Sequence, residues 1–210
     1  MKRILNSFLS LSLVLPFCVC LAAASGCGGG GGGKGLDDVA LLHTEKKKIA
    51  ASTPVDKAFA AGPLEVGQFS DGREGEKDVV GVFEENGFKV RTKGDVRAFW
   101  AGALRQGMES AGAKFGAPAN ARFDAQLLEF NCIEGNTYNA TVRMKITVTR
   151  HDGTTAPWTK NYDGSSKRWG KSHKDENFTE ALSSAVNEVT RKMVQDAEFA
   201  TAIMGKPATP

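Results

Sequence analysis

The sequence predicts an α+β domain, in which an antiparallel sheet with a three-strand meander carries two amphipathic helices packed on one face. Three observations favour this class. Segments that alternate apolar and polar residues predominate between residues 64 and 163. Two other segments repeat apolar residues at helical spacing instead. The turns between the alternating segments are rich in Gly, Asn and Asp, which favour tight connections. The length of 210 residues suits one such domain.

The first strands are predicted directly after Pro63. Residues 64–69 alternate with period two and stop at Ser70-Asp71-Gly72, so we expect a strand ended by turn residues. Two more strands, 79–83 and 88–90, flank a turn that ends in Asn86-Gly87. The Asn-Gly pair supplies the positive φ angles that a tight hairpin requires.

The first helix is predicted to follow Asp95, whose carboxylate can accept hydrogen bonds from the first turn. Apolar residues recur at helical spacing from Val96 to Ala111, and Gly112 suits the left-handed residue that closes a helix. Gly107 lies on the apolar stripe, although glycine costs about 1 kcal/mol against alanine in a helix interior. We therefore expect Gly107 to permit close packing on the sheet.

Three strands at about 121–133, 138–150 and 157–163 form the predicted meander, because their connections contain Gly, Asn and Asp. The middle strand has apolar residues on one face and Arg, Lys and Thr on the other, which indicates one buried and one wet face. In the first strand the apolar phase changes, which predicts a bulge near Leu128.

The last helix is predicted from Asn177, with Glu180 three residues on as in a capping box. The domain is therefore expected to span 64–197 and to fold without the residues before it, while 198–210 form a loose tail. The predicted core includes four residues from the two helices and the middle strand: Leu104, Val142, Ile146 and Val186.

Residues 1–26 have the organisation of a secretory signal peptide. Lys2 and Arg3 precede an apolar run that extends to Ala24. A transmembrane helix is the alternative, since it needs about 20 apolar residues. Pro16 within the run and the small residues at its end favour a cleaved signal.

The cleavage site is specific, because Ala24-Ser25-Gly26-Cys27 resembles a bacterial lipobox, which implies that Cys27 is acylated. Several acyl chains on one cysteine would anchor the protein stably in a membrane. The segment 27–63 would then be a lipidated cysteine, a glycine-rich tether and a lead-in. Six consecutive glycines, 28–33, predict a flexible coil, and the roughly nine residues after Cys27 would reach about 15–18 Å. With Gly28 rather than an acidic residue after the cysteine, the resemblance implies the outer membrane, facing the periplasm.

Cysteine usage agrees with export and leaves one thiol in the folded body. Cys18 and Cys20 leave with the signal, so only Cys132 remains beside Cys27. A single thiol forms no internal disulfide. We expect Cys132 to be a small buried residue of a strand rather than a nucleophile.

Several segments resemble the YajG-like outer-membrane lipoproteins over about residues 64–197. The likeness lies in the strand before Asp71-Gly72-Arg73, in Asp95-Val96-Arg97 before a helix, in Thr159-Lys160-Asn161-Tyr162, and in Asn177 with the helix after it. No catalytic residues belong to that group. The resemblance therefore implies a fold and a cellular location, but no reaction.

No catalytic, metal-binding or cofactor motif is apparent, so we expect a non-enzymatic binding or assembly module. His43, His151 and His173 lack metal-ligand spacing, and we expect each to be solvated. The net charge of +3 argues against nucleic acid as a partner. The alternative is a periplasmic enzyme, or a protein that binds a small ligand or glycan, with an unrecognised site.

The one surface feature above background mixes aromatic residues and cations over 158–174. Such a set suits sugar rings or a protein partner, here an envelope protein or peptidoglycan. The alternative is that the aromatic residues cover the sheet and the cations are solvated. The candidate partner-binding residues are Trp158, Lys160, Tyr162, Lys167, Arg168, Trp169 and Lys171.

Cys27→Ser is expected to release the protein from the membrane fraction, because no thiol remains to carry acyl chains. Fractionation and the mass of the N-terminal peptide measure this. A wild-type peptide without lipid mass, together with a Ser variant that stays in the membrane fraction, would contradict the prediction.

Overall fold

The computed structural model describes residues 35–44, 48–152 and 156–205. The chain divides into two units, Met1–Gly32 and Gly33–Pro210, and all described residues belong to the second. The predicted signal peptide, Cys27 and the glycine run lie outside the described residues.

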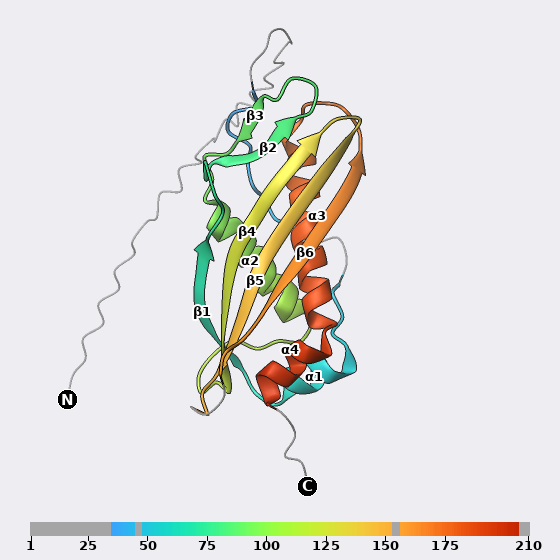
Figure 1. The fold of residues 1–210 in the computed structure, drawn as a ribbon. Coiled ribbons are helices and arrows are strands. Elements are labelled where there is room, and N and C mark those ends of the chain that lie inside the picture. The colour runs from blue at the N-terminus through green and yellow to red at the C-terminus, as the bar shows by residue number, and fades with distance from the viewer. Residues whose placement is uncertain (1–34, 45–47, 153–155, 206–210) are drawn as a thin grey trace, which may run out of the picture. The chain divides into compact units, whose positions relative to one another are not determined.

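The described body contains a six-stranded, mostly antiparallel sheet with the order β3-β2-β4-β5-β6, in which β1 also pairs with β4 (Figure 1). Three long strands form the predicted meander, with β4 paired to β5 and β5 to β6. Strands β1 and β2 lie parallel to β4 along successive parts of its length. The strands are β1 Leu64–Asp71, β2 Val79–Phe83, β3 Lys89–Arg91, β4 Ala121–Glu134, β5 Thr137–Arg150 and β6 Trp158–Trp169.

The predicted bulge is confirmed. The register of β4 against β5 shifts between Leu127 and Glu129, so Leu128 is the extra residue. On either side of it the buried side chains of β4 change from odd to even positions, as at Leu127 and Phe130. The bulge therefore keeps both halves of the strand facing one core.

The described residues contain four helices, and α2 and α3 lie on one face of the meander, behind the strands in Figure 1. Asp95 caps α2 as predicted, since its side chain accepts from the Ala98 amide at 3.0 Å. Gly112 follows this helix with a φ of 101°. The helices are α1 Thr53–Ala60, α2 Val96–Ser110, α3 Asp175–Val194 and α4 Ala197–Met204.

The predicted cap of the last helix was wrong by three residues, since Lys174 rather than Asn177 is the N-cap. Helix α3 begins at Asp175, and the Asn177 side chain donates to Ser172 Oγ at 2.7 Å instead of capping the helix. The placement of Gly107 was also wrong. A Cβ on Gly107 would lie 2.9 Å from Thr190 Cγ2, so this glycine permits close packing of α2 on α3 rather than on the sheet.

Residues 197–204 are helix α4 rather than part of a loose tail. Phe199 is fully buried, and its ring packs edge-on against Phe59 of α1 and Phe123 of β4. This short helix gives too few turns for a clear periodicity in the sequence, but its apolar side closes one end of the core. Residues 206–210 lie outside the described part of the chain.

The lead-in also belongs to the core, which corrects the expectation that 64–197 contains every core element. Val39, Ile49 and Phe59 are buried. Residues 39–42 run along the helices, where their carbonyls accept from three hydroxyl groups. These bonds are Thr92 Oγ1 to Val39 O, Thr179 Oγ1 to Ala40 O, and Ser183 Oγ to Leu42 O. Backbone bonds to β3 hold this segment as well, from Val39 N to Arg91 O and from Arg91 N to Leu36 O. This extended strap, residues 36–42, has no periodic pattern of its own, so the sequence did not place it in the core.

The predicted core residues are confirmed, because the side chains of Leu104, Val142, Ile146 and Val186 are fully buried. Cys132 is also buried, and burial together with the nearby Glu134 carboxylate raises the pKa of its thiol to about 12. The thiol is therefore protonated at neutral pH, as a structural cysteine requires.

Phe59→Ala is expected to lower the free energy of unfolding by about 3–5 kcal/mol, because it empties a buried site between α1 and α4. Leu42→Ala is the matched control in the same lead-in, since Leu42 is 68% exposed and a surface change costs within about 0.5 kcal/mol. Chemical denaturation measures both. Equal stability of the two variants would show that the lead-in is dispensable.

Candidate functional site

The residues predicted as a partner-binding set lie mostly on β6, which continues to Trp169 instead of ending near 163. Alternation along this strand divides the set. The even positions of β6 lie on the side covered by the helices, since Tyr162 and Gly164 are buried there. The members of the set on this side are Trp158, Lys160, Tyr162 and Arg168. Lys167 and Trp169 lie on the opposite side.

The end of β6 was predicted too early because its covered positions carry small residues. Gly164 and Ser166 lie under α3, and a Cβ on Gly164 would lie 2.0 Å from the Ala185 carbonyl oxygen. Ser166 Oγ donates to Ala181 O at 2.7 Å. Because α3 lies so close to the strand, these buried positions have no room for the large apolar residues by which a buried strand face is normally recognised in a sequence.

The first part of the set ties β6 to the start of α4. Tyr162 Oη donates to Asp196 Oδ2 at 2.6 Å, and Lys160 Nζ lies 2.8 Å from the same carboxylate oxygen and 2.9 Å from Glu198. Burial raises the pKa of Asp196, but the hydrogen bonds from Lys160 and Tyr162 outweigh it, so the pKa is lowered overall. Burial and the Asp196 contact raise the pKa of Tyr162. The geometry gives these residues a structural role.

Two further members of the set are also engaged within the chain. Trp158 packs on Phe199 with ring centroids 6.2 Å apart. Arg168 forms an ion pair with Glu180 of α3. Both contacts lie between β6 and the helices, so each side chain has a structural role.

Lys167 and Trp169 are the members of the set left on the open face of the sheet. Trp169 is 80% exposed, and Lys167 Nζ lies 5.6 Å from the centroid of its indole ring. Ile133 lies on the same face, across Asn139 from Lys167, and is 37% exposed. This end of the open face therefore joins an aromatic ring, a cation and an aliphatic side chain.

The rest of the open face is polar and internally paired. Arg143 of β5 donates to Asp163 of β6 and lies 4.0 Å from Glu129 of β4. Thr147 and Thr159 share a hydrogen bond across the same two strands. The apolar surface of the face is thus concentrated at the Trp169 end.

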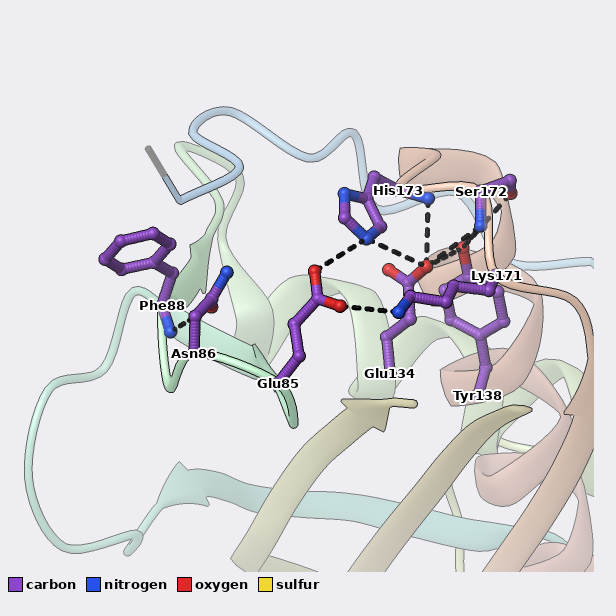
Figure 2. Close-up of polar contacts among 8 residues, drawn as sticks. All are labelled: Glu85, Asn86, Phe88, Glu134, Tyr138, Lys171, Ser172 and His173. Atoms are coloured by element: carbon purple, nitrogen blue, oxygen red, sulfur yellow. Dashed lines mark hydrogen bonds and ion pairs between the residues drawn. The ribbon is translucent and has the colours of Figure 1, made fainter. Parts of the chain in front are cut away.

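A second polar cluster surrounds Glu134 at the end of β4, and the sequence analysis did not identify it (Figure 2). Its side chain is fully buried, and Oε1 accepts from Tyr138 Oη at 2.8 Å, from the Ser172 amide at 3.0 Å and from the His173 amide at 2.9 Å. Oε2 is buried without a hydrogen-bond partner among the described residues. The alternation in the sequence could have predicted this burial, because Glu134 falls on the same face of β4 as Phe130 and Cys132.

Lys171 and His173 connect this cluster to the β2–β3 turn. Lys171 Nζ forms an ion pair with Glu85, and its hydrogen bond lowers the pKa of that carboxyl group. His173 has a positive φ of 49°, stacks on Phe83 at 4.6 Å, and places Nε2 3.7 Å from Glu85 Oε1. Figure 2 shows these side chains converging from the turn and from the loop before α3. Lys171 is therefore part of a loop anchor.

The histidines do not assemble a metal site in the described part of the chain. His43 is half-buried between Gln106 of α2 and Asn187 of α3, each 3.0 Å away, which corrects the expectation that it is solvated. His151 lies 2.9 Å from Glu65. Over residues 35–44, 48–152 and 156–205, no group of three His, Cys, Asp or Glu side chains could hold a metal ion.

Comparison with known proteins identifies the family. A family model described as an uncharacterized lipoprotein matches residues 68–204, which include the sheet and both long helices. The chain belongs to this lipoprotein family. No curated protein matches it.

Solved structures that resemble this lipoprotein come from several bacteria. A Xanthomonas campestris protein is 12% identical with a TM-score of 0.48, over 77% of this chain and 93% of its own. A Caulobacter crescentus protein is 12% identical with a TM-score of 0.46, over 72% and 97%. A Chlamydia trachomatis protein is 11% identical with a TM-score of 0.46, over 69% and 99%.

None of the described helices of this lipoprotein has both the length and the apolar character that are needed to cross a bilayer.

Glu134→Ala is expected to destabilise the lipoprotein, because three donors lose their acceptor. The buried Tyr138 hydroxyl alone would cost about 1–3 kcal/mol. Tyr138→Phe should cost less, since it removes a donor and leaves the carboxylate its two amide bonds. Glu129→Ala, on the open face, is the control for loss of a glutamate from β4. Melting temperatures in the same order as these costs support the cluster's anchoring role, and a Glu134→Ala variant as stable as the control would refute it.

Proposed function

We propose that this protein is a YajG-like outer-membrane lipoprotein, held by an acylated Cys27 and facing the periplasm. There it acts as a non-enzymatic binding or assembly module. Membership of a lipoprotein family supports the anchor, since Cys27 follows a lipobox-like sequence. The residue after Cys27 supports the outer membrane.

The observation that carries the binding role is the uncovered end of the meander. Helices cover one face of the sheet, while Trp169, Lys167 and Ile133 lie on the other. A tryptophan that is 80% exposed keeps a large apolar surface in water, and such surfaces mark interaction sites when they adjoin other apolar residues. Tryptophan is also enriched among residues that dominate binding energy.

The tether gives this surface access to its surroundings. The sequence predicts a glycine-rich tether, and the roughly nine residues after Cys27 would reach about 15–18 Å as a flexible coil. A body on such a tether can turn its open face toward an envelope protein or peptidoglycan. The indole–ammonium pair suits either partner, because aromatic faces and cations bind both sugar rings and protein surfaces.

Trp169→Ala with Lys167→Ser is expected to reduce crosslinks to envelope components in intact cells, while the melting temperature stays nearly unchanged. Both side chains are exposed on the open face, where changes cost within about 0.5 kcal/mol. Arg168 and Lys171 stay unchanged, because their ion pairs are structural.

The matched control for that pair is Lys145→Ser with Thr159→Ala, nearer the other end of the same face. Mass spectrometry of the crosslinked species from each strain measures the effect. Equal crosslinking by the two double variants would contradict a binding role for the Trp169 end.

A cleft beside Trp158 favours small-ligand binding as a second candidate function. It has a volume of about 500 Å³ and lies between the β5–β6 end of the sheet and α4. Val148, Pro157 and Ala197 contribute to its mainly apolar lining, with Arg150 at its side. A site of this composition suits an apolar small molecule.

A further inference from the structure

Among the described residues, strand β6 pairs with β5 alone and so forms an edge of the sheet. Its twelve residues pair with β5 in a continuous register, without a bulge. The strand also contains no proline. Proteins usually protect an edge of this length with bulges, prolines or covering segments, because its free backbone groups can pair with another chain.

The hydrogen bonds of neighbouring strands identify which β6 backbone groups point outward. Glu84 N donates to Glu134 O, so even residues at this end of β4 direct their backbone groups toward β2. Directions alternate along each strand, and two residues paired in an antiparallel ladder point either toward each other or away from each other. The backbone groups of Ile133 therefore point toward β5, those of its partner Asn139 point back toward β4, and those of Lys167, opposite Asn139, point away from β5. The odd residues of β6 thus lie on the free edge.

One contact confirms this assignment. Lys192 Nζ of α3 donates to the Asp163 carbonyl at 2.7 Å, as expected for a carbonyl directed away from β5. Among the described residues, no other hydrogen bond to an outward backbone group of β6 is recorded. The outward residues are Thr159, Asn161, Asp163, Ser165, Lys167 and Trp169.

We propose that this edge pairs with β6 of a second copy of the chain, antiparallel about a two-fold axis at Ser165. The two sheets would then join into one continuous sheet with both open faces on the same side. This goes beyond the proposed function, since it concerns the backbone edge rather than the open face.

Charge complementarity selects the axis at Ser165. In this register Asp163 of each copy lies opposite Lys167 of the other, on the open face, so the symmetry creates two opposite-charge pairs. Ser165 lies opposite Ser165, and Asn161 opposite Trp169. Each of these pairs joins outward residues, as hydrogen-bonded pairs of an antiparallel ladder must.

Neighbouring registers place like charges together or create no charge pair. An axis at Asp163 sets two carboxylates opposite each other, and an axis at Lys167 sets two ammonium groups opposite each other. An axis at Gly164 puts Lys160 opposite Arg168. Like charges directly opposite each other destabilise a sheet. An axis at Ser166 avoids such pairs, but it sets Asp163 opposite Trp169 and gains no ion pair.

Lys192 must release the Asp163 carbonyl when the edges pair. Its ammonium group also lies 3.9 Å from Glu188 and is 45% exposed along its side chain, so it keeps a partner and solvent. The backbone amide of the second copy replaces it as donor. Lys192 therefore protects the edge in the single copy without preventing pairing.

Disulfide crosslinking in intact envelopes tests the register, with the full chain. The copies of Ser165 would form a hydrogen-bonded pair about 5.5 Å apart at Cα, within the roughly 4.4–6.8 Å that a disulfide spans. Ser165→Cys is therefore expected to give a crosslinked dimer under a mild oxidant. Asn161→Cys is the matched control on the same edge, because the two copies of Asn161 would be about 26 Å apart. The native Cys132 is buried and does not compete.

Charge reversal tests the selected pairs. In the Ser165→Cys background, Lys167→Glu should lower the yield of dimer roughly fivefold to tenfold, since two favourable pairs become repulsive. Adding Asp163→Lys should restore the yield, because each pair regains opposite charges. Melting temperatures of the variants show that folding is preserved, and the restored double variant excludes a folding defect from Lys167→Glu.

Equal crosslinking by Ser165→Cys and Asn161→Cys, or a yield unaffected by Lys167→Glu, would overturn the proposal. The proposed function has a separate readout in Trp169→Ala alone, which leaves the Asp163–Lys167 pairs in place. Loss of the dimer with Trp169-dependent crosslinks to other envelope components retained overturns the self-pairing alone. A dimer that persists when those crosslinks disappear supports the self-pairing and removes the proposed function.

Discussion

The close contact between α3 and the meander is the constraint on which the rest of the structure depends. Gly164 lets the helix backbone approach β6 so closely that a methyl group there would overlap the Ala185 carbonyl. Ser166 bonds to the same helix one turn earlier. On its other sides α3 contacts α2 through Thr190 at Gly107, and holds the lead-in through Thr179. One helix thus links the sheet, the second helix and the strap.

This arrangement covers one face of the sheet and leaves the other exposed to solvent. The open face carries polar side chains that suit contact with water, and some of them pair across strands, as Arg143 does with Asp163. The pairing is incomplete at the Trp169 end, where no described element covers the aromatic side chain. The same one-sided layering leaves β6 as an edge, so a binding surface and a pairing edge share one strand.

The loop before α3 is fixed by electrostatics rather than by apolar packing. One oxygen of the Glu134 carboxyl group, Oε1, replaces its lost hydration with one hydroxyl and two backbone amides. Those amides belong to Ser172 and His173, so the loop is held at the end of β4. Lys171 and His173 then extend the contact to Glu85 of the β2–β3 turn. The direction in which α3 leaves the sheet follows from this anchor.

The sequence by itself determined the elements that repeat. Alternation of apolar and polar residues predicted the meander and its bulge at Leu128. Helical spacing of apolar residues predicted α2 and most of α3. The N-cap at Asp95 could also be predicted, because it depends only on neighbouring residues. Only the tertiary structure decided the parallel pairing of β1 and β2 with β4, because period two is the same for either direction. It also decided that the lead-in and α4 complete the core, since short segments bury a few residues without a period. The candidate site was divided for the same reason. Composition grouped Trp158, Tyr162 and Trp169, but alternation along β6 placed the first two on the side of the helices, with Tyr162 buried and Trp158 partly buried, and left Trp169 in solvent.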